Sequence, residues 1–567
     1  MCGHSWRQPL GFAGRKGLRH TNIALRRQFV RFGREEDGAV AVLLGIMIIV
    51  ILMIAALAID QLRFTSESMQ DQYALDAALL AASDAIGHPD QDELAKARAL
   101  AFYKANRPDG SVHDIAEMTV DAAAGTVAGT TRFDWKATLL RAFGLEQVKL
   151  GGQARVVRGG TAEIALVLDN SGSMAGTYIN DLKTAATSLV NTVYYGVDGE
   201  GKISVSVVPF AGSVNVGAGY RGAAWIDNDG ASAISKENAI DQRTRFQLFD
   251  DLSTSWGGCV EMRAPPYDIS DAGADPATPD TLFAPMFAPD EPDDVNDGGA
   301  NYANNYITDD GGDCPKQACV CSEYRSPGKC KSSPGWVLTP LTPAAAQART
   351  CKYRGQQPGI AASSGDKCSR GTLKGAGPNA YCTTRPILPL ATRKADVLDS
   401  ISGMIANGMT NITEGVAWGW RTLSPSEPFT QGRSYNDADN NKIIILMTDG
   451  QNTYTSTSDH NRSRYGALGY AKPYQSPGNG RLGTTYSSSS YTSLMTGRTR
   501  QACEAAKASG IKIYTVAFRL ESDPATLSLL RDCATEPRDA FVASDGASLI
   551  ESFQNIAREI AKLRIAG

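Results

Sequence analysis

One stretch, IALVLDNSGSM at residues 164–174, constrains the fold of this 567-residue chain more than any other. Its apolar residues end at an acid, Asp169, and the hydroxyl side chains of Ser171 and Ser173 follow before a helical pattern begins. A buried strand that ends in a D-x-S-x-S loop and opens a helix places three oxygen-bearing side chains on one turn. Mg²⁺ and other hard cations bind such oxygen ligands, but Asp and Ser also serve as helix N-caps. The loop alone is therefore weak evidence for a metal site, and the prediction depends on two later segments that supply further oxygen ligands.

Strand and helix patterns alternate from Thr161 onward, which predicts an α/β fold with a doubly wound, mostly parallel sheet in residues 160–567. Two stretches interrupt the alternation. Residues 212–392 are rich in Gly, Pro, Asp and Asn and hold eight cysteines, so we expect an insertion that needs disulfides to stay ordered. Residues 452–497 have the composition of a flexible surface loop. The expected strands are 164–168, 203–209, 443–447, 511–518 and 541–543, and the expected helices are 179–194, 393–407, 413–423, 498–509 and 547–563.

Residues 39–59 form an uncharged apolar run of 21 residues. At about 1.5 Å per helical residue the run reaches about 30 Å, which is enough to cross a bilayer. Residues 1–37 hold eight Lys and Arg against three acids, so the positive-inside rule predicts a cytoplasmic segment at 1–38 and everything after residue 60 across the membrane. Cleavage of a signal peptide at Ala56-Leu57-Ala58 is the alternative. The helical pattern continues through that site, which favours a retained anchor.

Residues 60–158 predict a small α+β neck between the anchor and the main domain. The helix is expected to continue to Gly87, with alanines every three or four residues on one face. That face fits packing within the neck or assembly with another subunit, and the two interpretations stand equal. A second helix is expected at 92–106, alternating runs at 118–122 and 126–131, a helix around Trp135–Phe143, and a strand near 148–157.

Cysteine usage agrees with a domain beyond the membrane. Ten of the eleven cysteines follow the anchor, and an even number in an oxidising compartment predicts disulfides. Zinc is the alternative for four of them, but their C-x₄-C-x-C-x₈-C spacing lacks the C-x₂-C pairs of common zinc sites. Those four are Cys314, Cys319, Cys321 and Cys330.

Two later segments supply the remaining oxygen ligands. Gly408-Met409-Thr410 lies between two helical patterns, and the apolar strand at 443–447 runs directly into Thr448-Asp449-Gly450. In an open α/β sheet, ligands bind where loops leave the carboxyl ends of the strands. Asp169 and Asp449 both follow strand ends, and Thr410 can reach the same edge. The sequence therefore predicts a divalent-cation site, with Mg²⁺ as the expected ion and Mn²⁺ or Ca²⁺ as alternatives.

The order D-x-S-x-S, G-x-T and a strand ending in T-D-G resembles the von Willebrand factor A (VWA) domain. The resemblance implies that its metal-ion-dependent adhesion site (MIDAS) maps onto five positions of this chain. It also implies that an acidic side chain of a protein partner completes the coordination of the ion. The five positions are Asp169, Ser171, Ser173, Thr410 and Asp449.

Further segments resemble a narrower group, the TadG-like proteins of the bacterial Flp-pilus or tight-adherence system. They include LDAALLAASDA, VPFAGSVNVG, WGGC, TLFAPMFAPDE and TNITEGVAWGWRTLSP. The resemblance implies a single-pass inner-membrane protein with a periplasmic domain that contacts pilus-assembly components. It also implies a disulfide between Cys503 and Cys533, and Cys259 with Cys382 is a second candidate pair that brackets much of the insertion.

Other functions are less favoured by the sequence. Residues 196–202 match G-x₄-G-K, but they precede a strand, whereas a phosphate loop follows one, so no nucleotide site is expected. The acidic body, with a net charge of −4 for the whole chain, argues against nucleic acid. Acid-rich turns at 293–297, 309–313 and 437–441 lack a complete EF-hand spacing. A hydrolase and a purely structural scaffold remain as alternatives, although no Ser/Cys–His–Asp arrangement can be identified among five histidines, and the chain is not expected to be an enzyme.

Overall fold

A computed structural model describes residues 38–566 of the chain, with gaps. The residues outside the description are 1–37, 84, 86–89, 108–113, 122–125, 138, 140, 142–146, 158–160, 195–200, 240, 294–301, 316–317, 322, 332–335, 340, 361–372, 374, 438, 475–479, 484–485 and 567. The basic N-terminal segment, most of the G-x₄-G-K stretch and most of the turn at 293–297 therefore lie outside it. The chain divides into two compact units, Met1–Arg158 and Gly159–Gly567.

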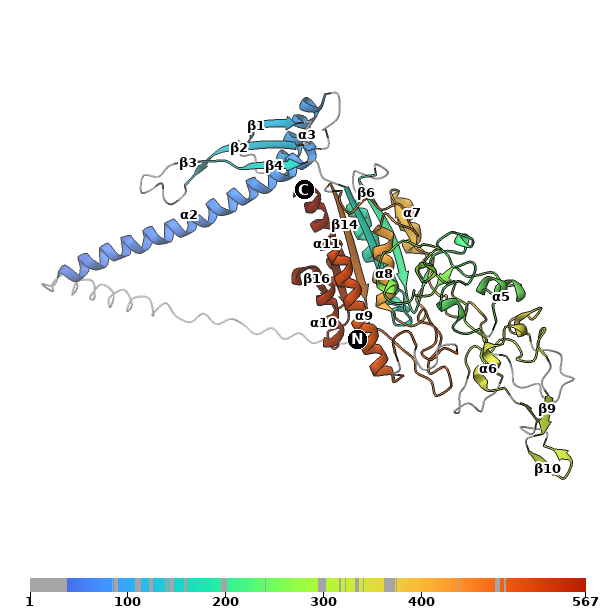
Figure 1. Cartoon of the computed structure of the whole chain (residues 1–567). Coiled ribbons are helices and arrows are strands. Elements are labelled where there is room, and N and C mark those ends of the chain that lie inside the picture. Colours follow the sequence, from blue (N-terminus) through green and yellow to red (C-terminus); the bar gives the residue numbers. More distant parts are fainter. Residues whose placement is uncertain are drawn as a thin grey trace, which may run out of the picture. The chain divides into compact units, whose positions relative to one another are not determined.

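A single long helix, α2 (Gly38–Ser83), dominates the first unit (Figure 1). Within the described residues it is the one helix long and apolar enough to cross a membrane, over Leu43–Ser83. Large apolar side chains near its start are exposed, for example Leu43 at 61% and Ile54 at 62%. Such a surface is costly in water and suits lipid. The chain thus carries one N-terminal apolar helix of membrane-spanning character.

The alanine face of α2 is buried inside the first unit. Ala74, Ala78 and Ala82 are fully or almost fully buried, and α2 packs against α3 (Gln91–Asn106) and against the neck sheet. Small side chains let the two helices approach closely. Of the two interpretations of this face, packing within the neck is the one that the structure supports.

The neck sheet is antiparallel and built around β2 (Thr126–Lys136), with β1 (Asp114–Asp121) on one side. On the other side β3 (Gln147–Leu150) and β4 (Gln153–Val157) keep one register with β2, so they form a single strand interrupted at Gly151-Gly152. The prediction of a helix around Trp135–Phe143 is wrong at its start, since Trp135 lies in β2. Its side chain alternates inward with Phe133 and meets Phe64 of α2 at 5.6 Å between ring centroids. Most of residues 138–146 lie outside the description.

The second unit is mixed α/β around an eight-stranded sheet in the order β16-β15-β14-β5-β6-β7-β8, with β13 also paired to β6. The five strands from β16 to β6 are parallel, whereas β7, β8 and β13 add antiparallel pairings. From β5 the chain continues to β6 on one side and later returns to β14 on the other, so the strand order reverses between β5 and β14. The strands are β5 (Thr161–Asp169), β6 (Ile203–Phe210), β7 (Val214–Asn215), β8 (Cys259–Val260), β13 (Leu388–Ala391), β14 (Asn440–Thr448), β15 (Lys512–Phe518) and β16 (Ala540–Ala543).

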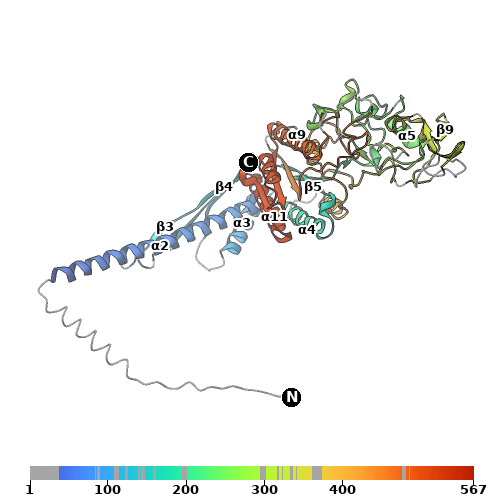
Figure 2. The same cartoon turned by 90° about the horizontal axis from the view of Figure 1, so that it is seen from below.

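Helices cover both faces of this sheet. Ile164, Leu166 and Leu168 of β5 pack with α4 (Thr177–Val193), α7 (Lys394–Ser402) and α11 (Gly546–Ala566); α4 and α11 lie side by side (Figure 2). The alternate residues Ala165 and Val167 pack with α8 (Ile412–Leu423), α9 (Ser488–Ala508) and α10 (Pro524–Cys533). This alternation is why the apolar run of β5 is continuous.

Two helix boundaries in the second unit differ from the predictions by five residues or more. Helix α9 begins at Ser488 rather than 498, because Ser487 caps it by accepting a hydrogen bond from the Ser490 amide at 3.3 Å. Helix α7 ends at Ser402 rather than 407, followed by Gly403. In both cases serine and glycine residues, which favour caps, set the ends.

Helix α8 lies unusually close to the sheet. A Cβ atom placed on Gly415 would lie 2.7 Å from Cδ1 of Phe210, and one on Gly419 would overlap the stiff side chain of Val167. Glycine is therefore required at this contact despite its low helix propensity.

We expect Gly419→Ala to lower the free energy of unfolding by about 1–2 kcal/mol, because overpacking outweighs the gain of about 1 kcal/mol in helix propensity. Gly497→Ala in α9 is the matched control. A Cβ there meets nothing within 4 Å, so the same propensity gain should raise stability. Urea unfolding followed by tryptophan fluorescence measures both, and a stabilised Gly419→Ala variant would contradict the close packing.

The insertion shares the core that lies beneath α8 and is linked by disulfides. Buried aromatic side chains of Trp225, Phe249, Phe287 and Tyr353 continue the core beneath α8. The two pairings expected from the resemblance, Cys259–Cys382 and Cys503–Cys533, are present, together with Cys314–Cys351 and Cys321–Cys330. A zinc site built on the four clustered cysteines is therefore wrong. The helices and short strands that the insertion adds outside the main sheet are α5 (Arg245–Asp251), α6 (Pro343–Ala348), β9 (Ala318–Cys321), β10 (Tyr324–Ser326), β11 (Lys329–Cys330) and β12 (Trp336–Thr339).

The prediction of a flexible surface loop at 452–497 is wrong for most of its described residues. Tyr465 and Tyr470 are buried, and Arg481 forms buried ion pairs with Glu237 and Glu261. The last ten residues of the stretch belong to α9. The serine- and glycine-rich composition predicts flexibility, but a few large side chains pack against the insertion and fix this segment.

Candidate metal centre

Asp169 is the last residue of β5 and is fully buried. Its Oδ1 accepts a hydrogen bond of 2.8 Å from the Ser171 amide, which bends the chain into the turn. Its Oδ2 accepts a hydrogen bond of 2.6 Å from the hydroxyl of Thr448, the last residue of β14. The carboxylate is thus held from both strands that border the reversal of strand order, where ligands of such sheets gather.

The two serines and the second acid meet on the same side of the turn. The hydroxyls of Ser171 and Ser173 lie 2.9 Å apart, and Ser173 donates a 2.7 Å hydrogen bond to Oδ1 of Asp449. These residues are 276 positions apart in sequence. The structure therefore brings four of the five predicted ligands into one hydrogen-bonded cluster.

The loop that carries Thr410 is joined to this cluster through its backbone. The amide of Gly172 donates to the carbonyl of Gly408 at 2.9 Å, which Gly408 permits with a φ of 99°. The amide of Thr410 donates to the hydroxyl of Thr453 at 2.7 Å, and the Thr453 amide returns a 2.9 Å bond to the Thr410 carbonyl. The Thr410 loop is thus bonded both to the serine turn and to the chain that follows Asp449.

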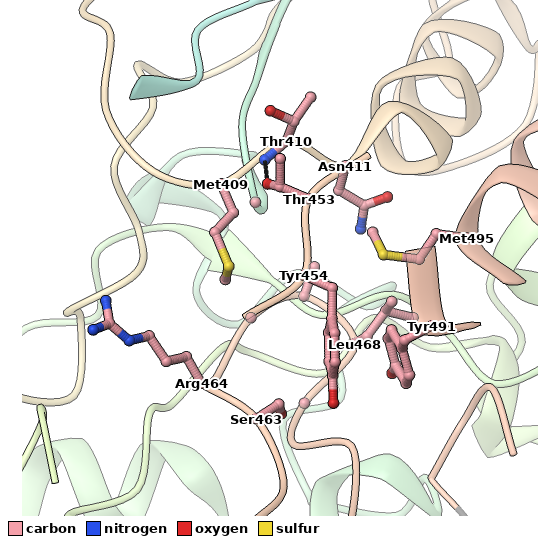
Figure 3. A pocket seen from close by; sticks show the side chains of 14 residues that line it. Met409, Thr410, Asn411, Thr453, Tyr454, Ser463, Arg464, Leu468, Tyr491 and Met495 are labelled. Carbon is pink, nitrogen blue, oxygen red and sulfur yellow. Dashed lines mark hydrogen bonds between the residues drawn. The ribbon is translucent and has the colours of Figure 1, made fainter. Parts of the chain in front are cut away.

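A small cavity of about 30 Å³ lies beside this loop (Figure 3). Met409, Tyr454 and Tyr491 are among the residues that border it, and the two tyrosine rings stack at 3.9 Å between centroids. The hydroxyl of Thr410 points away from this cavity (Figure 3). The cavity is therefore a neighbour of the candidate centre and not the place where its oxygen ligands meet.

Asp169 and Asp449 repel each other when both are ionised in the folded protein. Burial, reinforced by the charge of Asp449, raises the pKa of Asp169 to about 6, although hydrogen bonds from Thr448 and Ser171 lower it. Burial also raises the pKa of Asp449, against the hydrogen bond from Ser173. One buried and one half-buried carboxylate, each with a raised pKa, create an environment in which a bound cation stabilises the charged forms.

The donor set fits a hard divalent cation. Two carboxylates and three hydroxyls are all oxygen donors, and Mg²⁺ commonly takes one or two carboxylates and keeps several waters. Among the described residues no group of three or more acid, histidine or cysteine side chains is arranged so that it could hold a metal ion. The candidate centre therefore depends on its hydroxyl ligands as much as on its acids, and the acid-rich turns at 309–313 and 437–441 form no such group in their described residues.

Sequence reasoning missed three residues that position the centre. Thr448 holds Asp169, Thr453 holds the Thr410 loop, and the buried Asn452 accepts a 2.8 Å hydrogen bond from the Ile412 amide at the start of α8. Thr448 could have been found as the residue before Asp449 in T-D-G. The other two lie in the stretch that composition marked as a loop.

No family model and no curated protein match the chain. Among solved structures, it is similar to the vWF domain of the type V pili tip protein Mfa5 from Porphyromonas gingivalis, at 9% identity and a TM-score of 0.32, covering 72% of this chain and 98% of that one. The pilus adhesin SpaC from Lactobacillus rhamnosus GG is matched at 11% identity and a TM-score of 0.31, over 81% of this chain and 35% of SpaC. The PilB minor pilin from Streptococcus sanguinis is matched at 10% identity and a TM-score of 0.30, over 80% and 79%. The chain thus spans about a third of SpaC.

Proposed function

We propose that this chain is a membrane-anchored protein whose second unit is a VWA-type domain that binds a protein partner through a divalent cation. Asp169, Ser171, Ser173, Thr410 and Asp449 would hold the ion, with Mg²⁺ expected. The ion would supply a coordination position for an acidic side chain of the partner. The observation that carries the proposal is the hydrogen bond between Ser173 and Asp449, which joins the serine turn to the end of a distant strand.

The remaining residues have supporting roles. Thr448 fixes Asp169, and the Gly172–Gly408 and Thr410–Thr453 contacts fix the Thr410 loop. These contacts hold oxygen ligands from three segments in place before an ion binds, which reduces the cost of ordering them on binding.

The cellular role that we propose is assembly or anchoring of a Flp-type pilus. It rests on the TadG-like sequence segments and on the apolar helix α2, which we propose to be a single-pass inner-membrane anchor with a cytoplasmic N-terminus and a periplasmic second unit. The partner would be a pilus-assembly component that offers an exposed acid.

A structural scaffold with a dispensable metal site is the second candidate function. Burial of the alanine face within the neck removes the surface that first suggested helix-mediated assembly with other subunits. A hydrolytic role is less supported, because Ser171 stands where a phosphotransferase would need a second catalytic acid. We propose a protein without enzymatic activity.

Isothermal titration of the purified full-length protein in detergent with Mg²⁺ and Mn²⁺ tests the proposal. We expect one ion to bind per chain, with heat that disappears after saturation. A pull-down from cells that carry the pilus genes should then recover a partner with Mg²⁺ and lose it with EDTA. Absence of ion binding contradicts the metal centre, and an EDTA-insensitive partner favours the scaffold.

A further inference from the structure

A fixed guanidinium emerges at the same edge of the sheet as the candidate metal centre. Strands β14 and β15 are parallel and paired as far as Thr448 opposite Ala517. Asp449 follows directly after β14, and Arg519 follows Phe518 at the end of β15. Neighbouring strands are about 4.8 Å apart, so the chains that carry Asp449 and Arg519 leave the sheet side by side.

The backbone at Arg519 adopts a conformation that is costly for this residue type. Its φ is 56°, in the left-handed region that favours glycine. Its amide donates a 2.7 Å hydrogen bond to the carbonyl of Ala543 at the end of β16, which holds the turn in place. Residues kept in such conformations cluster at binding and catalytic sites. The turn aims an arginine side chain outward from the strand end.

Aromatic contacts then hold the Arg519 side chain. Its guanidinium lies 4.5 Å from the ring centroid of Tyr178 and 5.5 Å from that of Phe518, and Nη1 donates a 3.2 Å hydrogen bond to the Tyr178 hydroxyl. Tyr178 lies in the first turn of α4, five positions after the ligand Ser173. The guanidinium is thus fixed between the end of β15 and the helix that the metal-binding turn opens.

Arg519 keeps most of its donors for a ligand. The residue is exposed, a guanidinium carries five N–H donors, and one of them serves Tyr178. In the part of the chain that the structure describes, Arg519 forms no ion pair. The pKa of the nearby Asp545 is lowered mainly by hydrogen bonds from Ser548, and only as the weakest contribution by Arg519. Asp545 thus interacts with the guanidinium only weakly, which leaves the remaining donors of Arg519 to a ligand.

We infer that Arg519, held by Tyr178, is a second anion-binding position on the partner surface and binds a further carboxylate of the same partner. A guanidinium fork pairs with a carboxylate through two parallel hydrogen bonds. The inference rests on the proposed metal centre and specifies its partner further: the recognised segment carries two acids, one for the ion and one for Arg519.

Small carboxylates test the inference without knowledge of the partner. The probes are acetate and the linear dicarboxylates from succinate to suberate, titrated into the full-length protein loaded with Mn²⁺. Paramagnetic relaxation of the probe protons reports binding even when it is weak. A dicarboxylate has two equivalent carboxylates, so its affinity is first divided by two. At least one dicarboxylate should then bind about fivefold more tightly than acetate. A fivefold gain corresponds to an exposed ion pair of about 1 kcal/mol.

Arg519→Gln should remove this preference and leave the affinities for Mn²⁺ and acetate unchanged, whereas Arg519→Lys should keep part of it. Arg538→Gln is the matched control, since Arg538 precedes β16 and lies at the opposite edge of the sheet. If no dicarboxylate exceeds acetate, or if Arg519→Gln keeps the preference, the second position is refuted and the metal centre stands. If Mn²⁺ does not bind, the metal centre and the second position are both refuted.

Discussion

Asp169→Asn is expected to lower the affinity for Mg²⁺ by more than about 100-fold, because loss of residues that merely support a ligand already costs about 10–100-fold. The substitution removes one of two carboxylates from a site whose other ligands are neutral hydroxyls. The geometry of the turn should survive, because the amide oxygen of the introduced asparagine can still accept a hydrogen bond from the Ser171 amide. The Thr448 hydroxyl can in turn accept one from the new NH₂ group.

The same substitution, Asp169→Asn, should not destabilise the metal-free protein, although it weakens Mg²⁺ binding. Without a cation, burial and the charge of Asp449 both penalise the Asp169 carboxylate, so a neutral amide relieves repulsion. In EDTA the free energy of unfolding of Asp169→Asn should therefore equal or exceed that of the wild type. Asp399→Asn, at an exposed acid paired with Arg385, is the control and should change neither property. Calorimetry and urea unfolding measure the two effects, and undiminished Mg²⁺ binding would refute the role of Asp169.

The parallel sheet could be predicted because its central strands β5 and β14 are buried on both faces and therefore each have a continuous apolar run. All five predicted strands lie within the observed β5, β6, β14, β15 and β16, apart from one residue at Ile511. The meeting of Asp169 and Asp449 followed from the same pattern, because parallel strands have their carboxyl ends at one edge. The candidate site was predictable to the extent that it depends on strand direction.

Features that depend on register or on distant partners could not be predicted. The position of Arg519 beside the candidate metal centre follows from the register of β15 against β14 and from its left-handed backbone conformation, neither of which the sequence reveals. The sequence predicts a helix that begins near Trp135, but packing of its ring against Phe64 of α2 holds the residue in β2. Composition suggested that residues 452–497 are flexible, whereas the ion pair of Arg481 with Glu237 fixes part of them. Single buried pairs of this kind leave no periodic pattern in a sequence.

Lys352, a buried lysine in the insertion, forms another buried ion pair that leaves no pattern in the sequence. The ammonium of Lys352 lies 2.7 Å from Asp290 Oδ2 and 2.8 Å from Asp309 Oδ1, and all three side chains are buried. The backbone of Asp293 and that of Asp309 each donate a hydrogen bond to the carboxylate of the other residue. One cation therefore balances three acids, Asp290, Asp293 and Asp309. Burial lowers the pKa of Lys352, but attraction to Asp290 and Asp309 outweighs this effect and raises it.

Lys352→Met is expected to lower the free energy of unfolding by about 3–5 kcal/mol, the usual cost of leaving buried charges without their partner. Methionine preserves the length of the side chain, so the loss measures the charge. The effect should grow as pH rises from 5.5 to 8. Burial, with the charge of Asp309, already raises the pKa of Asp290 to about 7 even beside Lys352. The folded variant then binds more protons than the unfolded chain at low pH, and it loses that stabilisation as the carboxylates ionise.

Two variants separate the charge effect from general damage to the insertion. Lys331→Met removes an exposed ion pair with Glu323 and should cost less than about 1 kcal/mol. Adding Asp309→Asn to Lys352→Met removes one of the uncompensated acids and should restore part of the lost stability. Urea unfolding at pH 5.5 and pH 8, followed by tryptophan fluorescence, measures each variant. A pH-independent loss, or a double variant less stable than Lys352→Met, would show that packing and not charge makes Lys352 necessary.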